Sequence, residues 1–136
     1  MKIQNIWLVA ALALLPAAAG CGSPLVTVTG RVTYKGEPVP STLVTFMPDD
    51  GGRPSHAVTD DNGNFTLKYS RQEVGARRGK HTVFLTYHVS NEEELGQTEK
   101  APKELRAVID SFGDPKTSPL HYDVTRNGQF IDIKLD

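Results

Sequence analysis

The chain is poor in cysteine and tryptophan, with one of each among its 136 residues. A single cysteine excludes an intramolecular disulfide, so a folded domain has to be held together by its hydrophobic core. It also excludes a zinc site built from several thiolates. Long hydrophobic runs are lacking as well, because the apolar stretch at residues 6–15 is shorter than the ~20 residues that a membrane-spanning helix needs.

An excess of positive charge is also absent. The 15 basic residues are balanced by 16 acidic ones, and the net charge is −1. A nucleic-acid-binding domain is expected to carry a clearly basic surface. The cluster of Arg77, Arg78 and Lys80 is small and typical of a solvated loop. We therefore expect no nucleic-acid partner.

The first twenty residues have the pattern of a secretory signal peptide. Lys2 provides a positive start, residues 6–15 are apolar, and residues 17–20 are small. Cys21 follows directly, and this junction resembles the lipobox of bacterial lipoproteins, with Ala18 where that family prefers Leu. The resemblance implies cleavage after residue 20, a diacylglycerol on the sulfur of Cys21 and a short tether over residues 21–24. The alternative is that Cys21 is simply the first residue of a soluble secreted protein.

From residue 25 onward, apolar and polar residues alternate, which is typical of half-buried strands. Val28 and Val32 share one face of the first strand, and Gly30 between them indicates a bulge or close packing. Seven strands are predicted, around residues 25–34, 44–46, 56–59, 65–69, 81–89, 120–124 and 131–135.

Two Asn-Gly pairs, at residues 62–63 and 127–128, are strong hairpin signals because both residues tolerate positive φ. Seven short strands with such turns predict one all-β domain over residues 25–136, a seven-stranded antiparallel β-sandwich. The connection at residues 90–118 is unusually long. Within it, apolar residues fall on one face of a short helix expected to cap the sandwich, namely Leu105, Val108, Ile109 and Phe112.

Several segments resemble carboxypeptidase regulatory-like domains. Residues 28–39 (VTGRVTYKGEPV) are similar to the opening strand and turn of that family, and residues 59–67 (TDDNGNFTL) to its T-D-x-x-G-x-F-x-L hairpin. His81 replaces the usual aromatic residue of the G-x-Y-x-V strand at residues 79–83. The chain thus resembles small planctomycete-type lipoproteins with a carboxypeptidase regulatory-like or transthyretin-like domain. The resemblance implies a prealbumin-like sandwich, in a superfamily whose members are mostly accessory or adhesive modules.

No constellation of catalytic residues is predicted. The four histidines are scattered along the strands, at positions His56, His81, His88 and His121. Ser55, His56 and an aspartate at 60 or 61 could be drawn as a triad, but neighbours on a strand point to opposite faces. The chain also lacks the C-terminal Tyr-Arg-Gly-Ser type motif of transthyretin-like hydroxyisourate hydrolases. Such a hydrolase is the less favoured alternative to a non-enzymatic protein.

No metal and no cofactor is predicted either. The segment from Asp60 fails as an EF-hand, because Phe65 and Arg71 occupy the positions that require Gly and Glu. His121 and Asp123 share one face of a strand but lack a third ligand. A weak calcium site at Asp49, Asp50 or Asp60 stays an alternative to plain turns.

Two further candidates come from related sandwiches. Lys35 is expected to be exposed rather than joined in an isopeptide bond, since Asp132 stands where an Asn partner would be needed. Phe84, Phe112 and Phe130 are the aromatic residues that could be exposed for stacking on a sugar. Packing under the long connection is the alternative role for these three.

These observations together predict a lipid-anchored, non-enzymatic β-sandwich of the cell envelope that serves protein interaction or structural support. The alternative is a glycan-binding module of the envelope. The expected partners are the membrane, through the anchor at Cys21, and an envelope protein or glycan. The expected location is the periplasmic face of the outer membrane or the cell surface.

Overall fold

The computed structural model describes residues 24–88 and 103–136. The predicted signal peptide, the lipid attachment site at Cys21 and the acidic part of the long connection lie outside the described residues. Within the described ranges, no helix has the length and apolar character to span a bilayer.

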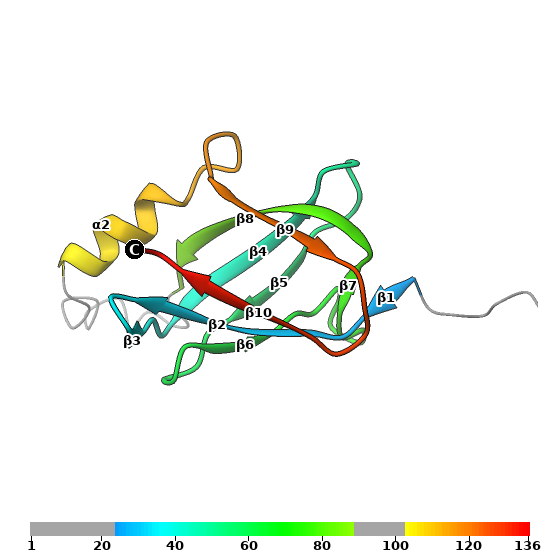
Figure 1. The fold of residues 1–136 in the computed structure, drawn as a ribbon, viewed down its shortest axis with the longest axis horizontal. Helices are drawn as coiled ribbons and strands as arrows, with labels where there is room; N and C mark the ends of the chain where they lie inside the picture. Colours follow the sequence, from blue (N-terminus) through cyan, green and yellow to red (C-terminus); the bar gives the residue numbers. More distant parts are fainter. Residues whose placement is uncertain (1–23, 89–102) are drawn as a thin grey trace, which may run out of the picture.

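Strands dominate the described chain and form two four-stranded sheets (Figure 1). The central strand of the first sheet is β2 (Val28–Tyr34), which pairs with β10 (Gln129–Lys134), β3 (Glu37–Pro38) and β6 (Asn64–Thr66). The second sheet has the order β5 (Ser55–Val58), β4 (Thr42–Pro48), β8 (Gly79–Tyr87) and β9 (Leu120–Val124). A short antiparallel pair joins β1 (Leu25–Val26) to β7 (Ala76–Arg77). The predicted all-β sandwich is confirmed.

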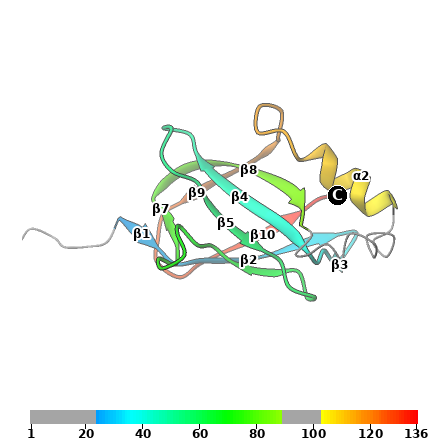
Figure 2. The ribbon, with the colours of Figure 1, turned by 180° about the vertical axis from the view of Figure 1, so that it is seen from behind.

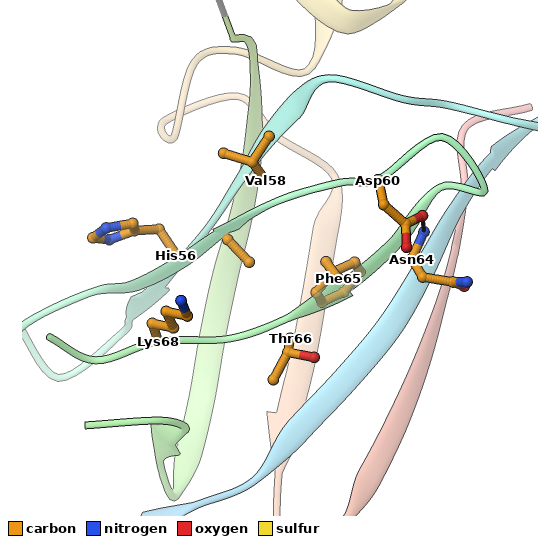
Figure 3. A pocket seen from close by; sticks show the side chains of 8 residues that line it. His56, Val58, Asp60, Asn64, Phe65, Thr66 and Lys68 are labelled. Carbon is orange, nitrogen blue, oxygen red and sulfur yellow. Dashed lines mark hydrogen bonds between the residues drawn. The ribbon is translucent and has the colours of Figure 1, made fainter. Parts of the chain in front are cut away.

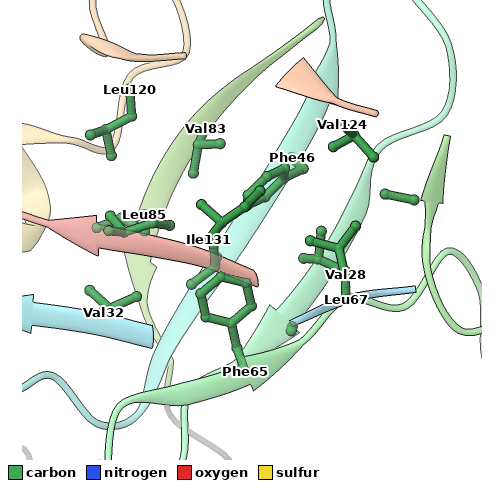
Figure 4. Packing of buried hydrophobic residues seen from close by; sticks show 14 of the residues in the cluster. Val28, Val32, Phe46, Phe65, Leu67, Val83, Leu85, Leu120, Val124 and Ile131 are labelled. Carbon is green, nitrogen blue, oxygen red and sulfur yellow. The ribbon is translucent and has the colours of Figure 1, made fainter. Parts of the chain in front are cut away.

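The hydrophobic core lies between the two sheets (Figure 4). Val28 and Ile131 of the first sheet are buried together with Phe46 and Leu85 of the second. The ring of Phe65 lies 6.2 Å from that of Phe46, centroid to centroid. These inward positions are the apolar positions of the alternating pattern, because successive side chains of a strand point to opposite faces.

Gly30 lies in β2 between β10 and β6, with the ring of Phe65 against it. A Cβ atom at this position would lie 2.3 Å from the carbonyl oxygen of Ile131 and 2.3 Å from the ring of Phe65. Such distances leave no space for a side chain. The close packing expected from a glycine on the apolar face is therefore confirmed.

One strand pair differs from a purely antiparallel arrangement, because β10 runs parallel to β2 over its whole length. The turn at Asn127-Gly128 leads from β9 in the second sheet to β10 in the first, so β9 and β10 do not pair with each other. The amides of Gly128 and Gln129 donate to the carbonyl of Thr27, which places the start of β10 beside the start of β2. The prediction of a hairpin between adjacent strands is wrong here, although Gly128 has the expected positive φ of 77°.

Helix α2 (Lys103–Ser111) packs against the end of the second sheet, as both views of the ribbon show (Figure 2). Ile109 is completely buried, and Leu105, Val108 and Phe112 lie partly buried against the core. The carbonyl of Phe112 accepts a hydrogen bond from the amide of Leu85 in β8. The predicted capping helix and its apolar face are confirmed.

Candidate functional site

The two strands around the first Asn-Gly turn separate from each other in their middle. They are joined at one end by two backbone hydrogen bonds between His56 and Lys68, and at the other by a bond from the amide of Asp60 to the carbonyl of Asn64. Between these two points no strand ladder forms, because β5 pairs with β4 in one sheet and β6 pairs with β2 in the other. The splayed segments leave an open groove on the surface (Figure 3).

This β5–β6 groove has a volume of about 470 Å³. His56, Val58 and Asp60 project outward along its first side, because they are the exposed positions of the alternating pattern. Its second side is formed by Asn64, Thr66 and Lys68. Ala57 and the buried Phe65 also line it. The groove therefore offers hydroxyl, amide, imidazole, ammonium and carboxylate groups beside apolar side chains.

A second hollow, the basic pocket, shares His56 and Lys68 with the groove. It has a volume of about 410 Å³ and is also lined by Arg53, Ser70 and Arg71. None of its lining residues is acidic, and Arg53, Lys68 and Arg71 form no ion pair within the described parts of the chain. Three cationic side chains without carboxylate partners concentrate positive potential at this end of the groove.

Arg53 is held in place by Tyr69. The guanidinium carbon of Arg53 lies 5.2 Å from the centroid of the Tyr69 ring, which is a cation–π arrangement. Tyr69 follows β6, which ends at Thr66, and its side chain is only partly buried. The predicted strand at residues 65–69 places Tyr69 on the same face as Phe65 and Leu67, but only Phe65 and Leu67 are buried in the core. The Tyr69 ring instead supports one cation of the basic pocket.

The alternation of residues does not predict the basic pocket, because its residues come from two segments on either side of a turn. The register of these two segments about the turn does indicate it. Folding the chain about the turn at residues 61–63 places His56 opposite Lys68, and the same register places Arg53 opposite Arg71. The local basic cluster that the sequence does display behaves differently, since Arg77 is paired with Asp50 at 3.8 Å.

Ser55 and His56 diverge, as the strand geometry predicts. Ser55 is buried, and its hydroxyl has no hydrogen-bond partner among the described residues, whereas His56 is exposed on the groove. His81 is also buried, with Nδ1 2.9 Å from the carbonyl oxygen of Gly79 and its ring 5.9 Å from that of Phe46. The structure therefore does not bring Ser55 and His56 together as members of a triad.

His121 lies on the outer face of the second sheet, beside Thr82. Its Nδ1 atom is 3.3 Å from the Thr82 hydroxyl, which in turn donates to a carboxylate oxygen of Asp49 at 2.8 Å. His121 and Asp123 are both exposed, as predicted for that pair. In the described parts of the chain, no three His, Cys, Asp or Glu side chains gather closely enough to hold a metal ion.

The carboxylates proposed as weak calcium ligands are engaged by donors of the protein. The Asp60 carboxylate accepts hydrogen bonds from the amides of Asn62 and Asn64, both at 2.9 Å. The Asp50 carboxylate accepts from the amide of Gly52 and pairs with Arg77. These geometries are those of ordinary Asx turns.

Lys35 is exposed, as expected, and its ammonium group lies 3.3 Å from the carboxylate of Glu104 in α2. The hydrogen bond to Glu104 raises the pKa of Lys35, with a smaller contribution from Tyr34. Asp132 pairs instead with Lys134, at 3.9 Å. Burial raises the pKa of Tyr122, and the charge of Asp132 adds to this effect.

The aromatic candidates for sugar stacking do not form one surface. Phe84 is partly buried in the second sheet, Phe130 is 59% exposed on the first, and Phe112 packs against the core. Phe84 and Phe130 both point away from the core, so they lie on opposite sides of the sandwich. A single ligand on one side cannot contact both.

No protein-family model matches the chain, and no curated protein matches it. The fold is similar to the crystal structure of a DUF3823 family protein from Parabacteroides merdae, with a TM-score of 0.42 and 13% sequence identity. The match covers 83% of this chain and 46% of the other, so the chain spans about half the length of that protein. At this level of similarity, the neighbour assigns neither a family nor an activity.

Proposed function

We propose that the protein is a non-enzymatic, lipid-anchored binding module of the bacterial cell envelope, with the carboxypeptidase regulatory-like or transthyretin-like sandwich that its sequence resembles. The observation that supports binding is the β5–β6 groove with its adjoining basic pocket. Together they present hydrogen-bonding and charged side chains from β5, β6 and the segments next to these strands.

The anchor is supported by the sequence around Cys21. Three residues, Gly22 to Pro24, separate Cys21 from the start of β1 at Leu25. An extended chain of this length reaches about 10–14 Å, so the sandwich would sit close to the membrane surface. The expected location is the periplasmic face of the outer membrane or the cell surface.

The anchor is tested by replacing the cysteine. Cys21→Ser is expected to release the protein from membranes or to leave the signal peptide uncleaved, because several acyl chains are needed for stable anchoring. The measurement is fractionation of the native cell, combined with mass spectrometry of the N-terminus. Normal processing and unchanged membrane retention of the variant would contradict the anchor.

The binding surface is tested by filling the groove. Thr66→Trp places a bulky side chain among the groove residues, whereas Thr86→Trp makes the same change at an exposed position of β8 away from it. Binding of the purified protein to isolated envelope material should fall for Thr66→Trp and persist for Thr86→Trp. Equal binding by both variants, each with a β-type circular dichroism spectrum, would show that the groove is not the binding surface.

A glycan-binding module is favoured over a protein-binding one by the chemistry of the groove. Thr66 and Asn64 offer a hydroxyl and an amide along one side, and these groups form the hydrogen bonds that sugar hydroxyls require. The groove is open along its length, so it could accept a segment in the middle of a polymer. Phe130, although well exposed, lies on the first sheet and does not line the groove.

A further inference from the structure

We infer that the groove and the basic pocket together bind an acidic polysaccharide, with a carboxylate of the sugar chain in the basic pocket. This inference rests on the proposed binding function and specifies its ligand. Three features of the basic pocket support this ligand: its charge, its geometry and its continuity with the groove.

The basic pocket differs in charge from the chain as a whole. The whole chain carries a net charge of −1, yet the pocket is lined by Arg53, Lys68 and Arg71 with His56 and no acid. Cations without a carboxylate partner also occur elsewhere in the described structure, such as Arg78 and Lys80, but the hollow that those two line also contains Asp49 and Asp50. Three neighbouring cations without such partners repel one another, and an anion placed among them would relieve that repulsion.

The geometry suits a planar or tetrahedral anionic group. Two guanidinium groups are suited to bidentate hydrogen bonds with a carboxylate, and Lys68 adds a mobile point charge. The Arg53 side chain is restrained by the Tyr69 ring, so less side-chain entropy is lost when Arg53 binds. Ser70 also lines the pocket, but its hydroxyl donates to the carboxylate of Glu73 at 3.4 Å, so the cations are the groups left for a ligand.

Continuity with the groove selects a polymer over a small anion. His56 and Lys68 line both hollows, so a ligand that places a carboxylate in the pocket can continue between Val58 and Thr66 toward Asn64. Beyond the pocket the groove contains no further cations but hydroxyl and amide groups and one carboxylate, that of Asp60, which already accepts two backbone hydrogen bonds. A chain of sugars with acidic residues matches this sequence of groups, whereas a phosphate ion or a lipid headgroup matches the pocket alone.

The test uses polygalacturonate as the probe, with dextran as the neutral control and the full mature chain carrying Cys21→Ser. Affinity for polygalacturonate at low salt should fall at least about tenfold in a Lys68→Ala, Arg71→Ala double variant. It should stay within about twofold in a matched Lys116→Ala, Lys134→Ala variant, whose two cations lie outside both hollows. Binding of the parent chain should also weaken with added salt, because the contacts are exposed and screened.

Other results of this binding experiment would contradict the inference. Absence of polygalacturonate binding, or equal losses in the two double variants, would overturn the inference. Tighter binding to vesicles of phosphatidylglycerol, or to inorganic phosphate, would replace the polysaccharide with a headgroup or a free anion. If the ligand is not an acidic polysaccharide but the groove is the binding surface, Thr66→Trp still reduces binding to envelope material. If the groove is not the binding surface, Thr66→Trp and Thr86→Trp bind envelope material equally.

Discussion

Two turns of this molecule contain the same Asn-Gly pair, and both lead from the second sheet to the first. Gly63 and Gly128 have nearly the same φ, 76° and 77°. The surroundings differ, because a Cβ at Gly63 would lie 2.5 Å from the carbonyl oxygen of Val32, whereas nothing lies within 4 Å of one at Gly128. The first turn is packed against the fold, and the second is open to solvent.

The two turns are also stabilised in different ways. At the first turn, the Asp60 carboxylate accepts two hydrogen bonds from amides of the same turn. At the second, the side-chain oxygen of Asn127 accepts a hydrogen bond from the distant amide of Thr27, at 2.8 Å. The first turn is thus determined locally, and the second depends on the position of β2. The antiparallel β6 thus follows a turn closed by its own residues, whereas the parallel β10 follows a turn attached to the start of β2.

The largest expected effect lies just beyond the first turn. Phe65→Ala removes a buried ring that packs on Phe46 and is expected to cost roughly 3–5 kcal/mol, against 2–5 kcal/mol for Ile131→Ala beyond the second turn. Because a domain of this size has about 5–15 kcal/mol of stability, Phe65→Ala should lower Tm by more than about 10 °C. Differential scanning calorimetry is the measurement, and a Tm within about 2 °C of the parent would contradict the assigned core.

The second prediction compares the glycines themselves. Gly128→Ala should cost roughly 1–2 kcal/mol, the ordinary penalty for a side chain at positive φ. Gly63→Ala should cost at least about 1 kcal/mol more, because the backbone around Val32 has to move as well. Urea denaturation of the two variants gives the comparison directly. An equal decrease in the free energy of unfolding for both variants would show that the backbone at Val32 moves without an energetic penalty.

The alternation of apolar residues predicts the longer strands and the buried face of α2, but not the two-residue strands β3 and β7. These features depend on periodicity within one segment, which a single sequence contains. The parallel pairing of β10 was not predictable in this way, because an Asn-Gly turn specifies its own φ values and not the strand that lies beside its exit. Arg53 and Arg71 likewise came together only through the pairing of His56 with Lys68.

The third prediction concerns the side chains that hold the turns. Asp60→Ala and Asn127→Ala should each cost about 0.5–2 kcal/mol, comparable to the loss of a helix-capping hydrogen bond. The two variants should differ in which backbone amides exchange their hydrogen faster. Asp60→Ala should speed exchange at Asn62 and Asn64, and Asn127→Ala at Thr27, the amides that lose an acceptor. Faster exchange at Thr27 in both variants would mean that the two turns are coupled.

The smallest effect on stability is expected at two exposed histidines. His56→Ala and His121→Ala should each change the free energy of unfolding by less than about 0.5 kcal/mol, because neither side chain is buried. The two should nevertheless differ in binding. His56 lines both the groove and the basic pocket, so its loss should weaken retention of polygalacturonate, whereas His121 lies outside both hollows. Unfolding curves and affinity electrophoresis of both variants provide the two measurements. Loss of binding or of any enzymatic activity in His121→Ala, with stability intact, would instead place the functional site at Thr82 and Asp49 on the outer face of the second sheet.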